Sequence, residues 1–265
     1  MIENRNLNKI DVEWNDDDVV PPVVYPNLDF LFQQMLHLTL KEVAASRGEL
    51  ILDVGCGRAI DSARLWEKGA RVVGLEPSQV MIGRAKKHLG KSNARVAIAQ
   101  GIGENLPFKS RSFDKVMCKG ALDHFLSPSK TIEEIARVLK PEGQMIISIA
   151  NFNSLGFRLG KKLYPITKFL SPSLAKERKP WEIPLDHTYK FDYPFLISLV
   201  KPHFEIQKTK GISLFFGLPL WGSFLSRLPH FIAYAVLNGL DRLSRPFPSL
   251  ADVILIKCTP THNPR

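Results

Sequence analysis

Short apolar runs rich in β-branched residues alternate with helical stretches between residues 50 and 150. This alternation limits the fold more than any other feature of the sequence. Runs at 50–54, 71–75, 94–99, 113–118 and 144–150 are separated by stretches with apolar residues three and four positions apart, such as 80–89 and 131–139. Strands that alternate with helices of this length form βαβ units, whose parallel strands are covered by helices on both faces. The sequence therefore predicts an α/β fold with a parallel sheet.

The pattern changes on both sides of this region. Residues 1–26 are acidic and contain the run 16–18 followed by two prolines, so we predict a solvated arm before a single domain over 27–265. After Ala150 the alternation stops: 151–190 is basic and rich in proline, and 211–240 holds a single charged residue, Arg227. A helix at 193–200, a strand at 204–209 and a last strand at 252–258 flank these segments. We interpret 151–190 and 211–250 as two insertions in the same domain.

Composition and charge exclude several classes of protein. With 45% hydrophobic and 23% charged residues, the chain is neither collagen-like nor wholly disordered. Cys56, Cys118 and Cys258 show no CxxC spacing, so we expect neither a disulfide framework nor a metal site. The N-terminal segment lacks the basic start and apolar run of a signal peptide, which makes a reducing cytoplasm the expected location. The net charge of +10 lies mostly in the second half, since residues 151–265 carry +9.

A glycine turn follows the first predicted strand. Gly55 and Gly57 let the backbone turn tightly and approach a ligand that a Cβ atom would block. A dinucleotide-binding turn needs a third glycine at the place of Ile60, and Asp53 would repel a pyrophosphate, so NAD is disfavoured. A carboxylate at this point suits an ammonium or sulfonium cation instead. The alternative is a tight strand-to-helix turn that binds nothing.

Glu76 stands at the end of the second predicted strand. An acid at this position accepts hydrogen bonds from both hydroxyls of a ribose in nucleotide-binding α/β folds. The alternative is a surface glutamate before Pro77, which begins the next helix.

These motifs resemble the class I S-adenosylmethionine-dependent methyltransferases, particularly the group that includes quinone-biosynthesis C- and O-methyltransferases. Segments 52–57, 74–78, 106–116 and 137–141 match the family's motifs in order, within a resemblance that covers 48–150 and weakens towards 209. The resemblance implies a three-layer, Rossmann-like, mostly parallel sheet of seven strands. The last strand would lie antiparallel between the fifth and sixth, with helical lid insertions. It also implies S-adenosylmethionine as the cofactor.

The same resemblance implies a set of cofactor-binding residues. Two departures from the family pattern bear on it: Ala59 replaces the usual third glycine, and Ile102 replaces an acid that binds the adenine amino group, which leaves that contact to backbone amides. A third departure, Glu142 in a usual Gly-Gly pair, is trivial. The implied residues are Asp53, Gly55, Cys56, Gly57, Glu76, Pro77, Met81, Gly101, Ile102, Gly103, Cys118 and Lys119.

Two histidines are candidates for the acceptor side of the site. His124 follows the fourth predicted strand and His187 lies at the end of the first insertion, where similar methyltransferases place pocket histidines. Methyl transfer to a hydroxyl needs a general base, and either histidine is a candidate for it. The alternative for each is a structural histidine in a loop.

The insertions bear on the substrate. In the sheet that the resemblance implies, the fifth and sixth strands run parallel, so both insertions would start at the same rim, over the acceptor pocket. One reading is a helical lid with its own core. The other is a pocket opening that contacts an anionic membrane through 211–240 and takes up an amphiphilic acceptor from it. Aromatic residues together with Lys and Arg are typical of such interfacial anchors. Prolines and Arg227 interrupt 211–240, which argues against a spanning helix.

We therefore expect O- or C-methylation of a small, hydrophobic or lipid-like acceptor, in the cytoplasm or at the inner face of a membrane. An RNA methyltransferase is the alternative that the basic second half suggests, but no added RNA-binding module is recognisable and the aromatic residues lie in apolar company. A scaffold that has lost catalysis is a further alternative, because of Ala59 and Ile102. The sequence predicts no oligomeric state.

Overall fold

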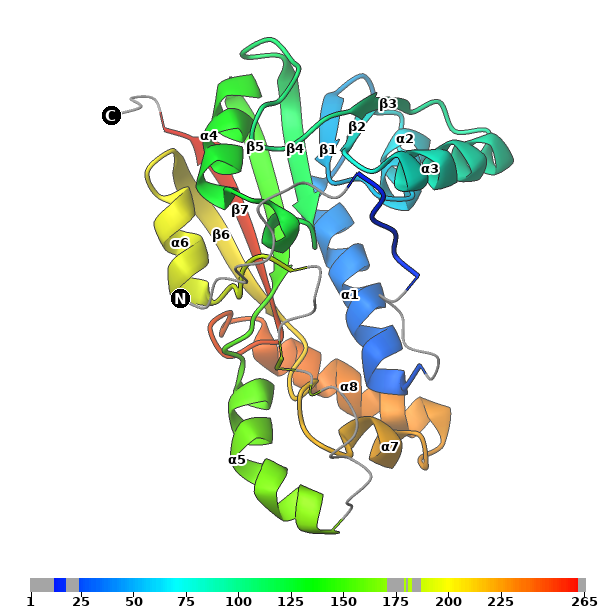
Figure 1. Cartoon of the computed structure of the whole chain (residues 1–265), viewed down its shortest axis with the longest axis vertical. Coiled ribbons are helices and arrows are strands. Elements are labelled where there is room, and N and C mark those ends of the chain that lie inside the picture. The colour runs from blue at the N-terminus through cyan, green and yellow to red at the C-terminus, as the bar shows by residue number, and fades with distance from the viewer. Residues whose placement is uncertain (1–11, 18–23, 171–178, 180, 183–186, 262–265) are drawn as a thin grey trace.

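The computed structural model describes residues 12–17, 24–170, 179, 181–182 and 187–261. Its centre is a seven-stranded sheet with the strand order β3-β2-β1-β4-β5-β7-β6 (Figure 1). The first five strands pair in parallel, and β7 runs antiparallel to both of its neighbours. The predicted sheet, with its antiparallel last strand between the fifth and sixth, is confirmed. The strands are β1 Leu50–Val54, β2 Arg71–Glu76, β3 Ala97–Gln100, β4 Phe113–Lys119, β5 Leu139–Ala150, β6 Phe204–Ile212 and β7 Val253–Pro260.

The helices connect these strands and cover both faces of the sheet. Most lie within a few residues of the predicted ranges. The main differences are in two strands: β5 begins at Leu139, whose backbone is already extended, and β6 continues to Ile212, so the second insertion starts two residues later than predicted. The helices are α1 Pro26–Val43, α2 Ile60–Glu67, α3 Gln79–Ser92, the 3₁₀ turn η1 Leu122–His124, α4 Pro128–Val138, α5 Leu155–Leu170, α6 Tyr193–Val200, α7 Trp221–Leu225 and α8 His230–Ser244.

Alternate residues of the central strands contribute to two separate cores. Leu52 and Val54 pack on the face covered by α4 and α6. Ile51, between them in sequence, packs on the other face, against Val43 of α1 and Leu65 of α2. Because successive strand side chains point to opposite faces, a strand that is buried on both must be apolar throughout. This is why β1 reads as an unbroken apolar run up to Asp53.

The two insertions pack against each other beyond the carboxyl edge of the sheet, where Figure 1 shows α5, α7 and α8 grouped together. Two glycines of α5 allow this close approach. A Cβ atom at Gly160 would lie 2.3 Å from the carbonyl oxygen of Gly217, and one at Gly156 would lie 2.9 Å from the Cα of Phe215. The buried carboxylate of Asp252 accepts a hydrogen bond from the Phe216 amide at 3.0 Å, and burial raises its pKa to about 6. The insertions therefore form one unit.

Gly160→Ala tests this packing. The added methyl group would overlap the Gly217 carbonyl, so we expect the free energy of unfolding to fall by about 1–3 kcal/mol, the usual cost of overpacking. Gly90→Ala on α3 is the matched control. It faces open space, so the variant should gain about 0.5–1 kcal/mol from helix propensity. Urea denaturation measures both, and equal shifts in the two variants would contradict the packing argument.

Candidate functional site

The glycine turn after β1 forms one wall of the candidate site. Gly55 has a φ of +75°, and a Cβ atom there would lie 2.5 Å from the Cβ of Ala121, so no other residue fits. The amides of Gly55 and Cys56 both donate to the carbonyl of Leu75, at 2.9 and 3.0 Å. Ala59 adopts a left-handed conformation, with a φ of +55°. A glycine at position 59 would adopt this conformation freely, whereas the Cβ atom of Ala59 makes it unfavourable.

The buried carboxylate of Glu76 joins the end of β2 to the glycine turn. Its Oε2 accepts a hydrogen bond from the Gly57 amide and its Oε1 accepts one from the Ser78 amide, both at 3.0 Å. Burial raises the pKa of Glu76, and these two amides and the charge of His124 act against that increase. Each carboxylate oxygen retains a second lone pair, so Glu76 has the acceptors that two ribose hydroxyls require.

Asp53 lies buried beside the turn. Ser62 donates its hydroxyl to Asp53 Oδ2 at 2.5 Å, and burial, together with the charge of Asp61, raises the pKa of Asp53 to about 7. Asp61 in turn forms an ion pair with Lys119, at 3.1 Å. A buried acid with a raised pKa is stabilised in its ionised form by a nearby cation, as predicted for an ammonium or sulfonium group.

The remaining residues of the implied cofactor site occupy two kinds of position. Met81 is buried below the turn, where its Cε lies 3.6 Å from the position of a Gly57 Cβ. Cys56 and Cys118 are also buried, and burial raises the pKa of both thiols. Pro77, Gly101, Ile102 and Gly103 follow the ends of β2 and β3, and Ile102 forms an isolated bridge with Asn105.

The described part of the acidic N-terminal arm lies against the site. Ser78 donates its hydroxyl to the Trp14 carbonyl at 2.5 Å, and the Gln79 amide donates to Val12. Asp16 forms ion pairs with Arg58 of the turn, at 2.6 Å, and with Arg84 of α3. Residues 12–17 of the predicted arm are mostly exposed and are held to the domain by these contacts. Acidic and basic side chains far apart in sequence attract each other here, and no local pattern reveals such a pairing.

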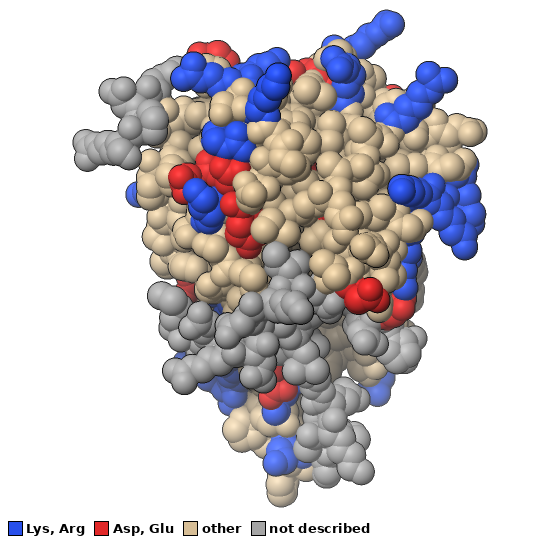
Figure 2. Space-filling view, turned by 45° about the horizontal axis from the view of Figure 1, so that its top comes forward, with Lys and Arg blue, Asp and Glu red and all other residues tan. Residues whose placement is uncertain are grey.

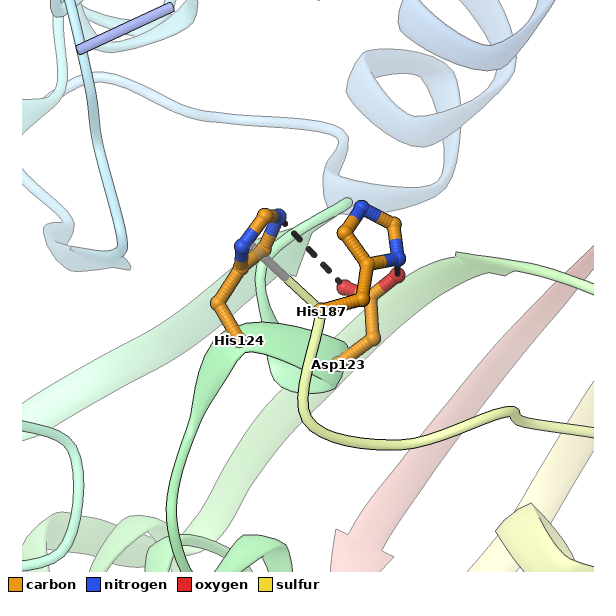
Figure 3. Close-up of side chains that lie close together, drawn as sticks. All are labelled: Asp123, His124 and His187. Atoms are coloured by element: carbon orange, nitrogen blue, oxygen red, sulfur yellow. Dashed lines mark ion pairs between the residues drawn. The ribbon is translucent and has the colours of Figure 1, made fainter. Parts of the chain in front are cut away.

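Both candidate histidines meet at a buried aspartate, as Figure 3 shows. Asp123 and His124 belong to η1, directly after β4. His187 Nδ1 lies 3.0 Å from Asp123 Oδ2, and His124 Nε2 lies 3.9 Å from Oδ1. The amides of Thr188 and Tyr189 donate to the Asp123 carbonyl, at 2.8 and 3.2 Å. These bonds fix the end of the first insertion on η1 and bring the two imidazole rings to a centroid distance of 4.4 Å.

Asp123 is the residue that sequence reasoning missed. Burial acts to raise its pKa, but the charge and hydrogen bond of His187 outweigh burial and lower the pKa to about 2. The ligand atoms of Asp123, His124 and His187 all lie within 4.8 Å of one another, so this cluster has the donor set of a divalent-metal site. The expectation that the chain has no metal site was based on the spacing of its cysteines. Cysteine spacing gives no information on a site formed by histidines and an aspartate.

An aromatic cavity of about 340 Å³ adjoins this cluster. The ring of Phe152 contributes to the cavity wall and also lies 6.1 Å from the ring of His187. Burial and the charge of Lys161 lower the pKa of Lys190, the basic residue of this wall. The lining residues are Phe152, Asn153, Tyr189, Lys190, Phe191, Asp192 and Phe195.

The sequence of this chain is similar to those of known methyltransferases. Residues 52–147 match the Methyltransferase domain family. The chain is 34% identical over 139 residues to a demethylmenaquinone methyltransferase of Clavibacter sepedonicus, a match that covers 52% of this chain and 56% of the relative. It is 31% identical over 142 residues to a ubiquinone biosynthesis O-methyltransferase of Dechloromonas aromatica, covering 48% and 60%. The chain thus spans little more than half the length of the curated relatives that it matches.

The fold also resembles that of solved methyltransferase structures. A SAM-dependent methyltransferase structure from Aquifex aeolicus superimposes with a TM-score of 0.56 at 13% identity, over 92% of this chain and 96% of that one. The fold is therefore that of the class I methyltransferases. Residues 52–147 match a methyltransferase domain, in line with the family that the sequence motifs resemble. The domain implies S-adenosylmethionine as cofactor, and the Gly55 turn, Asp53 and Glu76 fit its amino-acid and ribose groups.

Glu76→Ala should weaken binding of the product S-adenosylhomocysteine by about tenfold or more, because it removes both ribose acceptors and the anchor of the Gly57 amide. Calorimetric titration measures the affinity, and thermal unfolding of each variant separates a loss of binding from a loss of fold. Glu67→Ala, at the end of α2, is the control and should bind like the unaltered chain. Equal affinities for all three proteins would contradict the assignment of Glu76.

Asp53 should make this binding depend on pH. Because its pKa is about 7, the carboxyl group is mostly protonated at pH 6, and a ligand ammonium group favours the ionised form. Binding of S-adenosylhomocysteine should then release up to about one proton at pH 6 and almost none at pH 8.5. Calorimetry in two buffers of different ionisation enthalpy measures this release. Asp53→Asn should abolish it, and proton release that persists in the variant would assign it to another group.

Proposed function

We propose that this protein transfers a methyl group from S-adenosylmethionine to a hydroxyl group of a hydrophobic, ring-containing acceptor. The observation that carries the proposal is the Asp123–His187 pair at the end of β4. Two residues before Asp123, the side chain of Ala121 lies against Gly55 of the glycine turn. The carboxyl edge of the sheet therefore holds a cofactor wall and a potential proton acceptor side by side.

The character of the surroundings supports an apolar, aromatic acceptor. Rings of Phe152 and Trp14 contact the two histidines, at centroid distances of 6.1 and 5.5 Å. The relatives with about one-third identity are named for quinone biosynthesis, and we extend the corresponding acceptor class, a hydroxylated ring with an apolar substituent, to this chain. The cofactor supplies an electrophilic methyl group on a sulfonium. The chain supplies alignment, which can contribute about 7–11 kcal/mol to a reaction of this kind.

His187 is the general base of this proposal, and Asp123 is its positioning residue. His187 Nδ1 lies 3.0 Å from Asp123 Oδ2, and Figure 3 shows Nε2 on the side of the ring that points away from that carboxylate, so we assign Nε2 the role of proton acceptor. Nε2 would accept the proton of the acceptor hydroxyl as the hydroxyl oxygen takes the methyl group, and the bond from the methyl carbon to the cofactor sulfur would break to leave a neutral thioether. The ionised carboxylate of Asp123 then stabilises the imidazolium that forms. His124, 3.9 Å from the other carboxylate oxygen, lines the same space.

Replacing the base should lower the rate of transfer without loss of cofactor affinity. A catechol with a short prenyl chain is a suitable acceptor probe, with radiolabelled methyl transfer as the readout. We expect His187→Gln to lower kcat by about 10²–10⁴-fold, the usual contribution of a general base, and Asp123→Asn to lower it less. His187→Gln should also remove the rise of kcat with pH. S-Adenosylhomocysteine affinity should stay unchanged in both variants, and His124→Gln is the neighbouring control.

Three results would argue for other functions. Loss of activity with a chelator and its recovery with a divalent ion would assign Asp123, His124 and His187 to a metal site. Methyl transfer to RNA in place of the phenolic probe would favour the RNA alternative. Absence of any heat with S-adenosylhomocysteine at high concentration would favour a scaffold without catalysis.

A further inference from the structure

The insertions present large apolar side chains to the outside of the molecule. We call this set the apolar face, and it belongs to α5, α7, α8 and the turn after α8. Phe169 is 85% exposed, although a phenylalanine side chain gains about 1.5–3 kcal/mol when it is fully buried. The most exposed members are Phe169, Phe231, Leu243, Ile166, Phe247 and Phe224.

The helix α8 is apolar on two sides. Ala233 and Leu237 are buried in a small core with Phe30 of α1, as a lid with its own interior requires. Ile232, Val236 and Leu243 follow one another at spacings of four and seven positions on another side of the helix and are exposed. The prediction of buried helices in 211–240 thus describes one side of α8. The second apolar side has no function in packing among the described residues.

The two segments that carry the apolar face contain almost only basic charged residues. Residues 151–170 and 211–250 contain seven Lys or Arg and a single acid, Asp241. That acid is buried and pairs with Arg245, so it adds no exposed negative charge. Lys161, Lys162 and Lys168 are exposed on α5 beside its apolar residues. At the tapered lower end of the molecule in Figure 2, blue basic side chains lie among tan uncharged ones, with some red acidic surface beside them.

A row of aromatic rings connects the insertions to the histidine cluster. From His187, ring contacts run to Phe152 at 6.1 Å, on to Phe157 of α5 at 5.8 Å and on to Phe216 at 6.3 Å. Phe216 precedes α7, and the α5 glycines bind this loop tightly. The unit that carries the apolar face is therefore in direct contact with the proposed acceptor site.

We propose that the apolar face docks on an anionic lipid bilayer and that the acceptor enters the site from that bilayer. Exposed phenylalanines next to lysines fit the boundary between headgroups and acyl chains, where each basic residue is attracted by anionic lipid. A second copy of this chain fits worse, because two faces of the same positive charge would repel each other. No helix in the described part of the chain is long and apolar enough to cross a membrane. The delivery of the acceptor rests on the proposed function, whereas the docking does not.

Vesicle co-sedimentation with the full chain tests the docking. We expect binding to phosphatidylcholine vesicles that contain about one third phosphatidylglycerol, and much weaker binding to phosphatidylcholine alone. The double variant Phe169→Ser/Phe231→Ser should lower the partition coefficient by about tenfold or more, and Phe169→Leu/Phe231→Leu should restore most of it. Lys161→Glu/Lys162→Glu should also lower it. Lys86→Glu/Lys87→Glu, an equally exposed pair on α3, is the matched control and should have a much smaller effect.

Several outcomes would overturn the docking. One is equal sedimentation of the serine variant and the unaltered chain with anionic vesicles. Equal loss of binding in both lysine variants would reduce the interaction to net charge and reject a specific face. Dimers in analytical ultracentrifugation that depend on Phe169 and Phe231, without vesicle binding, would identify a second copy as the partner. S-Adenosylhomocysteine calorimetry on the same samples keeps the two proposals apart, because the apolar face lies outside the cofactor wall.

Discussion

The hydrogen bonds of one buried carboxylate organise the cofactor side of this protein. Glu76 binds the amide of Gly57 and the amide of Ser78, and it thereby holds the glycine turn of β1 and the start of α3 at a fixed separation. The cost of burying an acid is offset because both of its oxygens have partners and keep a lone pair for a ligand. The same junction positions Ser78, whose hydroxyl holds the N-terminal arm at Trp14. Turn, helix and arm thus depend on a single side chain.

Local patterns predicted the sheet well because its strands are buried on both faces. Leu50–Val54 contains nothing that could face water except Asp53, so the strand and the functional acid could be read together. The turn residues could also be predicted, because a left-handed backbone packed against another segment of the same chain excludes most side chains. Strand ends were less accurate. The first residues of β5 surround Pro141, which suggested a helix end, and only the pairing of Leu139 with Phe113 makes them part of a strand.

Long-range polar contacts account for what the sequence did not reveal. His124 and His187 were both candidates, but the carboxylate between them was not, because the importance of Asp123 arises from a residue 64 positions away. The arm is a similar case: its run of acids indicated a solvated segment, and its attraction to Arg58 and Arg84 depends on where α2 and α3 lie. Charge complementarity between distant segments leaves no periodic signal. Sequence reasoning therefore finds ligand-binding backbone more readily than it finds catalytic pairs.

The close approach of α5 to the loop before α7 has a consequence for the diversification of such proteins. Since Gly156 and Gly160 touch the backbone at Phe215 and Gly217, neither insertion can be exchanged for a foreign segment unless the other changes with it. A chimera that imports both segments from one parent preserves their contact, and a chimera that imports one loses it. Acceptor preference in proteins built this way should therefore be inherited as a two-segment module, separately from the nucleotide-binding half of the domain.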